Sequence, residues 1–179
     1  MRWEERLLDL FDDLEQQAEG MALAERDLLV AEQSRGEYAS VGLADRLHAS
    51  LGARVQVEVA GVGSLEATLV RAGAGWCLLD AGGRDWIVVL RAVGAVRGLR
   101  SGGVAADARP ATARLGLGSA LRGVAEARTE VALHRTDGAT TRGMLGRVGT
   151  DFVELWASSG AGGPVEVVPF GAVVAVRGG

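Results

Sequence analysis

The chain of 179 residues contains no lysine, and all 19 of its basic residues are arginine. It also has a single cysteine, and none of its apolar runs approaches the ~20 residues that cross a bilayer. One cysteine excludes an internal disulfide framework and any metal site built from several cysteines. These absences predict a protein of a reducing, cytoplasmic compartment that has no membrane-spanning segment.

The sequence also lacks a recognisable catalytic group. Cys77 lies in an apolar strand pattern where nothing would lower the pKa of its thiol, and His48 and His134 are unrelated in position. We expect both histidines to face solvent. The glycine-rich stretches lack the Gly-Lys-Ser/Thr ending of a phosphate loop. The chain is therefore predicted to be no enzyme and to hold no cofactor or metal.

Charge is divided unevenly along the chain. Residues 1–40 hold 11 acidic residues against 4 arginines, a net charge of −7, and residues 41–179 hold 12 against 15, a net charge of +3. This pattern indicates an acidic arm on a weakly basic body. Nucleic-acid-binding domains usually carry a stronger basic stripe, so charge alone does not establish such a surface.

The arm has the pattern of one helix over residues 3–34. Its apolar residues alternate at spacings of four and three, which is a heptad seam interrupted by the polar Gln17. We interpret the seam as a candidate surface for self-association; its apolar members are Trp3, Leu7, Leu10, Leu14, Met21, Ala24 and Leu28. Two roles stay open: packing on the body of the same chain, or pairing with the helix of a second copy.

Two stretches of the body, residues 43–98 and 117–178, repeat one pattern. Matching residues lie 74 apart at the start, 76 apart in the middle and 80 apart at the end, so insertions fall between elements. The matches include Leu43 with Leu117, Leu47 with Leu121, Arg54 with Arg128, Leu69 with Leu145, Arg71 with Arg147, Trp76 with Phe152, Val93 with Val173 and Arg97 with Arg177. An internal repeat of this kind predicts two copies of one supersecondary unit.

Each copy is predicted to contain a short helix and five short strands. The first has a helix over 41–51 and strands near 55–59, 65–71, 76–80, 86–90 and 92–97. The second has a helix over 113–124 and strands near 129–134, 140–148, 152–157, 165–169 and 172–177, with a hairpin turn at Asp137-Gly138. Short strands joined by glycine turns favour small closed or nearly closed barrels. Most aromatic residues fall at apolar strand positions, whereas Trp156 is expected to face outward or to cover an interface.

A helix followed by five bent strands resembles the Sm/LSm family of small barrels. The second copy carries the likeness through Thr136-Asp137-Gly138, Arg142-Gly143-Met144-Leu145 and Gly149–Leu155, in the place of the family's first motif, and Val167–Phe170 with Ala172–Val176 in the place of the second. The resemblance implies an α+β, mainly β fold: a long N-terminal helix followed by two tandem Sm-like barrels. It does not extend to the family's RNA pocket, because no asparagine follows Asp151 and apolar pairs, Pro169-Phe170 and Val89-Leu90, replace the second-motif Arg-Gly.

These patterns together predict four regions: a helical arm over 1–40, a first barrel over 41–98, a Gly/Ala/Arg-rich linker over 99–112 and a second barrel over 113–179. The expected function is that of an interaction or assembly adapter that binds a protein partner or a second copy of itself, with no membrane and no small-molecule substrate. The alternative is nucleic-acid binding through arginines repeated in the two copies, namely Arg71, Arg97, Arg147 and Arg177.

Overall fold

A computed structural model describes residues 38–157 and 165–179 of the chain. Contacts divide the chain into two compact units, Met1–Val41 and Gly42–Gly179. The second unit contains all ten strands of the sheet that the described residues form. The predicted N-terminal helix, with its heptad seam, lies outside the described residues.

The second unit repeats a pattern of one helix and five strands. The first half contains α2 (Leu43–Ala49), β1 (Arg54–Val59), β2 (Gly63–Gly73), β3 (Trp76–Asp80), β4 (Asp85–Val89), the 3-10 turn η1 (Leu90–Ala92) and β5 (Val93–Arg97). The connection carries two further 3-10 turns, η2 (Ala106–Ala108) and η3 (Ala111–Arg114). The second half contains α3 (Leu117–Ala127), β6 (Glu130–Arg135), β7 (Thr140–Val148), β8 (Phe152–Ala157), β9 (Val165–Pro169), η4 (Phe170–Ala172) and β10 (Val173–Gly178).

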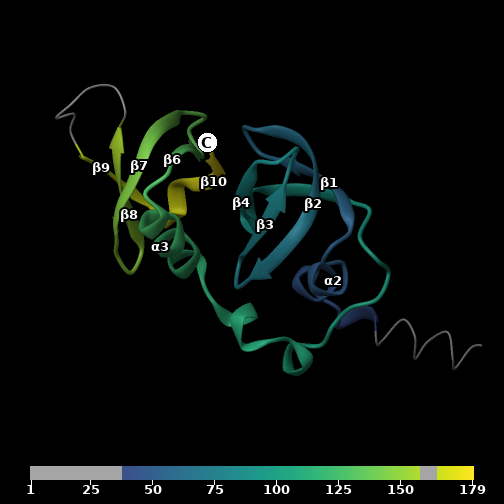
Figure 1. The fold of residues 1–179 in the computed structure, drawn as a ribbon. Helices are drawn as coiled ribbons and strands as arrows, with labels where there is room; N and C mark the ends of the chain where they lie inside the picture. The colour runs from purple at the N-terminus through teal and green to yellow at the C-terminus, as the bar shows by residue number, and fades with distance from the viewer. Residues whose placement is uncertain (1–37, 158–164) are drawn as a thin grey trace, which may run out of the picture. The chain divides into compact units, whose positions relative to one another are not determined.

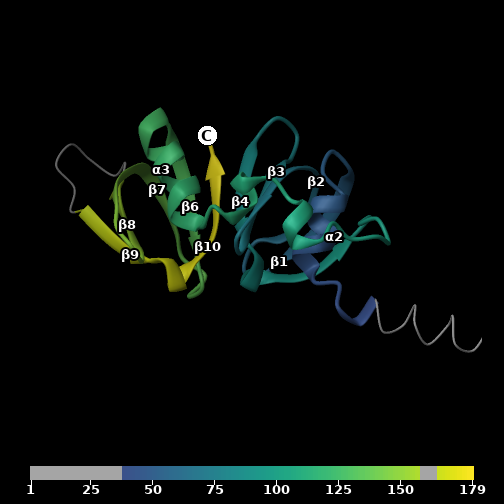
Figure 2. The ribbon, with the colours of Figure 1, turned by 90° about the horizontal axis from the view of Figure 1, so that it is seen from below.

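The ten strands form one antiparallel sheet in the order β5-β1-β2-β3-β4-β10-β6-β7-β8-β9. In both views of the ribbon, β10 lies between β6 and β4 (Figures 1 and 2). The prediction of two separate Sm-like barrels is therefore wrong. Each half does not close on itself, because the edge of β4 forms its hydrogen bonds with β10 of the other half. The sheet is open, and its two end strands are β5 and β9.

The two α-helices with described bounds are short. The helix α2 has 7 residues and α3 has 11. Within residues 38–157 and 165–179, no helix combines the length and the apolar character that crossing a membrane requires.

The duplication is visible in the registers of the strand pairs. In the first half Thr68 lies opposite Asp80, and 76 residues later Met144 lies opposite Trp156. The pairing of β2 with β3 shifts register after Leu69, and the pairing of β7 with β8 shifts after the equivalent Leu145.

The first strand of each half departs from the predicted match. Gln56 lies opposite Arg97 in the first half, whereas Ala132, not Glu130, lies opposite Arg177 in the second. Equivalent residues of β1 and β6 are therefore 76 residues apart, and not 74 as predicted. Compared with the first half, the second half has two extra residues between α3 and β6. Consequently Arg54 corresponds to Glu130, and its predicted match with Arg128 is wrong.

Two clusters of buried side chains form the core, and each contains residues from both halves. The first cluster, around Leu69 and Leu79, includes Val174 and Ala175 of β10. The second, around Leu121, Leu145, Val153 and Leu155, includes Trp76, Ile87 and Val89 of β3 and β4. The halves therefore complete each other's cores, which is the packing reason for a single sheet.

Candidate protein-interaction surface

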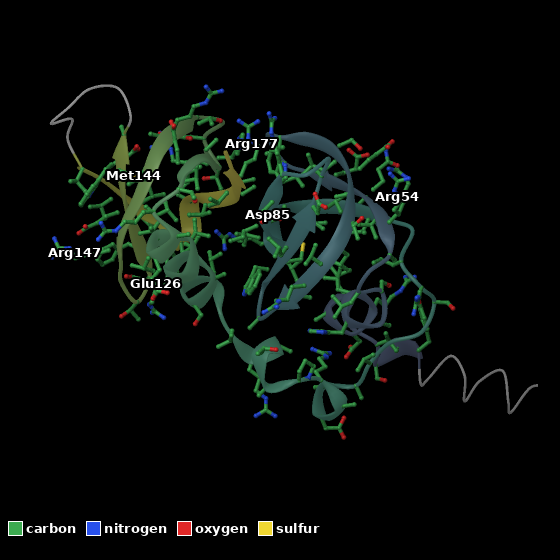
Figure 3. All side chains as sticks on the ribbon, in the orientation of Figure 1. Arg54, Asp85, Glu126, Met144, Arg147 and Arg177 are labelled. Atoms are coloured by element: carbon green, nitrogen blue, oxygen red, sulfur yellow. The ribbon has the colours of Figure 1, made fainter. Side chains whose placement is uncertain are left out.

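Four large apolar side chains are exposed together on β7, β8 and β9. Met144 is 42% exposed, Trp156 51%, Val165 51% and Val167 57%. Met144 lies opposite Trp156, which lies opposite Val165, and Val167 follows two residues later on the same face of β9. We call these four residues the C-terminal apolar patch. Figure 3 shows Met144 on the C-terminal half, away from Arg54 of the first half.

A glycine beneath the tryptophan shapes this surface. A Cβ atom at Gly146 would lie 3.0 Å from Nε1 of Trp156, so the indole packs directly over the backbone of β7. Beside it lies a concavity of about 330 Å³ whose lining includes Ala125, Arg128 and Trp156. The end of α3 and the neighbouring strands thus form a shallow groove with an apolar side and two basic residues, Arg128 and Arg147.

Arg147, which also lies near the patch, forms an ion pair with Glu154. The Nε atom of Arg147 donates to a Glu154 carboxylate oxygen at 3.2 Å, and the arginine side chain is 89% exposed. Exposed pairs of this kind contribute at most about 1 kcal/mol, so the pair leaves Arg147 accessible to a partner.

The first half has no equivalent patch. Three patch residues lie opposite one another across β7, β8 and β9: Met144, Trp156 and Val165. Their repeat equivalents lie opposite one another across β2, β3 and β4: Thr68, Asp80 and Asp85. A polar row therefore occupies the position of an apolar one. The fourth patch residue, Val167, corresponds to Ile87, which is only 7% exposed because the second half covers it.

Sequence reasoning identified one member of the patch and missed three. Trp156 faces outward as predicted. Met144, Val165 and Val167 were predicted only as strand residues, although period-2 alternation from the buried Leu145 and Val168 places all three on the outer face. That alternation was the available signal.

The four arginines proposed for nucleic acid do not form one site. Arg97, Arg177, Arg71 and Arg147 each line a different surface concavity. The repeat makes two equivalent pairs of these arginines: Arg71 with Arg147, and Arg97 with Arg177. Within each pair, however, the two arginines have different neighbouring residues, because the halves meet along only one edge of each.

Besides Arg147, two more of these arginines contact neighbouring side chains. The Arg97 guanidinium pairs with Glu58 at 2.9 Å. The guanidinium of Arg177 lies 5.6 Å from the ring centroid of Trp86, in a cation–π contact. A different cluster of arginines, missed from the sequence, lines a concavity of about 400 Å³: Arg84, Arg142 and Arg177, together with the acidic Glu130.

The reactive side chains are mostly buried. Cys77 is 2% exposed, and burial raises the pKa of its thiol to about 12, which fits the predicted inert thiol. The prediction that both histidines face solvent is wrong. His48 is 9% exposed, and His134 stacks on Trp86 with a centroid distance of 5.4 Å.

Burial is the main cause that lowers the pKa of both histidines. A nearby cation adds to the effect in each case: Arg109 lowers the pKa of His48, and Arg177 lowers that of His134. Both imidazoles are therefore held neutral near pH 7.

In the described part of the chain, no three His, Cys, Asp or Glu side chains are grouped closely enough to hold a metal ion. Comparison of the chain with protein-family models and with curated proteins finds no match.

Proposed function

We propose that this chain is a non-enzymatic interaction protein that binds a protein partner through the C-terminal apolar patch. The observation that carries the proposal is the exposure of four neighbouring apolar side chains, each between 42% and 57%. Contiguous apolar surface is costly to leave in water, since its burial contributes about 25 cal/mol per Å². Tryptophan and methionine are also enriched at protein interfaces, and Trp156 is the expected anchor.

The surroundings of the reactive groups support a non-enzymatic role. The Cys77 thiol, with a pKa of about 12, supplies no thiolate at neutral pH. His48 lies on α2 and His134 on β6, in different halves, so they do not form an acid–base pair. A buried free thiol also fits the cytoplasmic location that we propose.

The direct test measures capture of a partner from extract of the native cell by the full-length chain, with and without nuclease. Trp156→Ala should weaken capture about 30-fold, the loss typical of an interface anchor. Val70→Ala is the matched control, because Val70 is 44% exposed on β2 of the other half. Capture that Trp156→Ala leaves unchanged, or that nuclease abolishes, would contradict a protein partner on this patch.

Self-association through the N-terminal segment belongs to the same proposal and rests on the heptad seam. Replacing Leu10 and Leu14 together with aspartate in the full chain should lower the molar mass measured by light scattering, because buried charges disrupt a seam. An unchanged mass would assign self-association to another surface.

A second candidate function is nucleic-acid binding, and the cluster of Arg84, Arg142 and Arg177 is the observation that favours it. Three guanidinium groups around one concavity can contact phosphates. Binding of single-stranded RNA and duplex DNA should then weaken steeply with salt and fall in the double variant Arg84→Gln, Arg142→Gln. No binding near ~0.1 M salt would exclude this candidate.

A further inference from the structure

A cavity of about 490 Å³ is lined by α3 and β10 of the second half and by β2, β3 and β4 of the first half. Small-molecule sites in proteins usually have volumes of about 300–1,000 Å³ and mostly apolar walls with a few polar groups. This cavity fits that description, and none of the four residues of the C-terminal apolar patch lines it. Its larger apolar lining residues come from both halves: Trp76, Leu78, Ile87, Val124, Val131 and Val176.

The walls of the cavity are fixed by the packing around them. Nε1 of Trp76 donates to the Leu115 carbonyl oxygen at 2.8 Å, which holds the indole in one orientation. Ile87 and Val176 lie opposite each other in β4 and β10, the junction of the two halves, and are 7% and 2% exposed. A cavity already formed in the free protein does not have to be ordered when a ligand enters, which favours binding.

The side of the cavity formed by α3 leaves room for a ligand. Gly123, Val124 and Ala127 line the cavity from one face of this helix, because residues three and four apart share a face. A Cβ atom added at Gly123 would meet no atom within 4 Å. Open space therefore lies beside the helix at this position.

Two charged side chains line the cavity: Arg71 on β2 and Asp85 on β4. Figure 3 shows Asp85 where the two halves meet. Both residues are exposed, and within residues 38–157 and 165–179 neither has an ion-pair partner. The guanidinium group attracts an anionic group, whereas the Asp85 carboxylate repels it. An anionic ligand therefore has one preferred orientation, with its charge at Arg71.

The internal repeat shows what Arg71 lacks. Its equivalent in the second half, Arg147, pairs with Glu154, with 3.2 Å between Nε and a carboxylate oxygen. The first-half equivalent of Glu154 is Leu78, which lies opposite Arg71 and also lines the cavity. The first half therefore keeps the arginine, has an apolar side chain in place of its carboxylate partner, and has a cavity at that place.

We propose that this cavity binds a small monocarboxylate with an aliphatic body, whose carboxylate accepts hydrogen bonds from Arg71 as that of Glu154 does from Arg147. The aliphatic body lies against Leu78 and reaches the open space beside Gly123. This ligand goes beyond the proposed protein interaction, and it departs from the expectation of no small-molecule substrate. No local pattern in the sequence marks the cavity, because its lining residues come together only when the two halves meet.

The first test titrates the full-length chain with octanoate by isothermal titration calorimetry. One octanoate should bind per chain with a dissociation constant below about 1 mM. Octanol has the same aliphatic chain and no charge, so it should bind at least about tenfold more weakly, because charge-assisted hydrogen bonds are the stronger ones. Octanoate binding weaker than about 1 mM, or equal binding of the two compounds, would overturn the inference.

The second test removes the arginine. Arg71→Gln should weaken octanoate binding at least about tenfold. Arg147→Gln is the matched control, because it removes the same charge from the equivalent position of the repeat, which lines a different concavity. It should bind octanoate as the unmodified chain does. Equal weakening by both variants would show a response to net charge alone, and no weakening by Arg71→Gln would contradict the assigned carboxylate contact.

The third test occupies the site with protein atoms. Gly123→Leu fills the space beside α3, and Leu78→Glu supplies Arg71 with the carboxylate that the second half has. Each should weaken octanoate binding at least about tenfold while thermal melting shows a folded chain. Arg122→Leu, at an exposed position of α3 outside the lining, is the control for Gly123→Leu. Full binding by either filled variant in its folded state would reject the cavity as the site, and if both fail to fold, Arg71→Gln decides.

Discussion

The fifth strands of the two halves, β10 and β5, have similar sequences and very different surroundings. Val173, Val174, Ala175 and Val176 of β10 are all 2% exposed or less. The equivalent residues of β5, Val93, Gly94, Ala95 and Val96, are half-buried or exposed. One difference lies in their neighbours: β4 covers the second edge of β10, whereas nothing in the described residues covers that of β5. The burial of equivalent residues in these two strands therefore follows the strands that flank them as well as residue type.

The fourth strands show the same contrast. Ile87 of β4 belongs to the second core cluster, whereas Val167 of β9 belongs to the exposed apolar patch. The outer row of the second half is apolar where the first half has Thr68, Asp80 and Asp85. The duplicated unit thus has one copy with a polar outer row and a covered Ile87, and one copy whose outer face is apolar and exposed.

The largest expected effect breaks the sheet itself. Leu145→Asp should destabilise the protein by about 4 kcal/mol or more, because Leu145 is 6% exposed in the second core cluster and a buried charge has no partner there. Since β10 contributes to the first core cluster, hydrogen exchange should show lost protection in both halves. Protection retained in β1, β2 and β3 would show instead that the halves unfold independently.

A smaller effect compares β10 with β5 directly. Val176→Asp should lower the free energy of unfolding by roughly 3 kcal/mol, because Val176 is 2% exposed between two neighbouring strands. Val96→Asp, at the half-buried equivalent position, should cost about 1 kcal/mol in dilute monomer. Urea unfolding of both variants gives the two values. Equal losses would contradict the assignment of β5 as an open edge.

The comparison of β4 with β9 should give a still smaller difference. Ile87→Ala is expected to cost about 2–4 kcal/mol as a core truncation, and Val167→Ala less than about 0.5 kcal/mol in dilute solution. Thermal melts at low protein concentration measure both.

The smallest expected effect is a pH dependence from the histidine at the junction. The pKa of His134 is lowered in the folded protein, first by burial and then by Arg177. Its contribution to stability is therefore fully present above pH 6.5, the ordinary pKa of histidine, and is lost as the pH falls toward the lowered pKa, because the unfolded chain takes up the proton first.

His134→Gln should reduce the loss of stability between about pH 7.5 and pH 5 relative to the unmodified chain, measured by urea unfolding at each pH. His48→Gln provides the matched comparison in the first half, because burial lowers the pKa of that imidazole too. Parallel pH profiles for the His134→Gln variant and the unmodified chain would show that His134 does not contribute.

Local elements were largely predictable from the sequence. The ranges of β3, β7, β8 and β9 match the predicted strands, and the turn at Asp137-Gly138 joins β6 to β7 with Gly138 at φ +82. These features depend on alternation and turn chemistry within a few residues. Sequence reasoning placed the helix of the second half four residues too early, at residue 113 instead of Leu117. The offset between the first strands of the two halves was predicted two residues too low, because the second half has two extra residues between α3 and β6.

The candidate surface was predictable only in part. Trp156 was expected to face outward, and the buried Leu155 beside it supplied that signal. The surroundings of His134 could not be predicted, because Trp86, on which it stacks, comes from the other half of the chain.

The sequence by itself determined a duplicated unit of one short helix and five strands, since periodicity and glycine turns act between near neighbours. Only the tertiary structure decided that β4 pairs with β10, because the edge of a strand carries the same backbone hydrogen-bonding groups whatever its sequence. That one nonlocal pairing converts two predicted barrels into a single open sheet. It buries Ile87 and leaves Val167 in solvent, although both occupy the same position of the repeat.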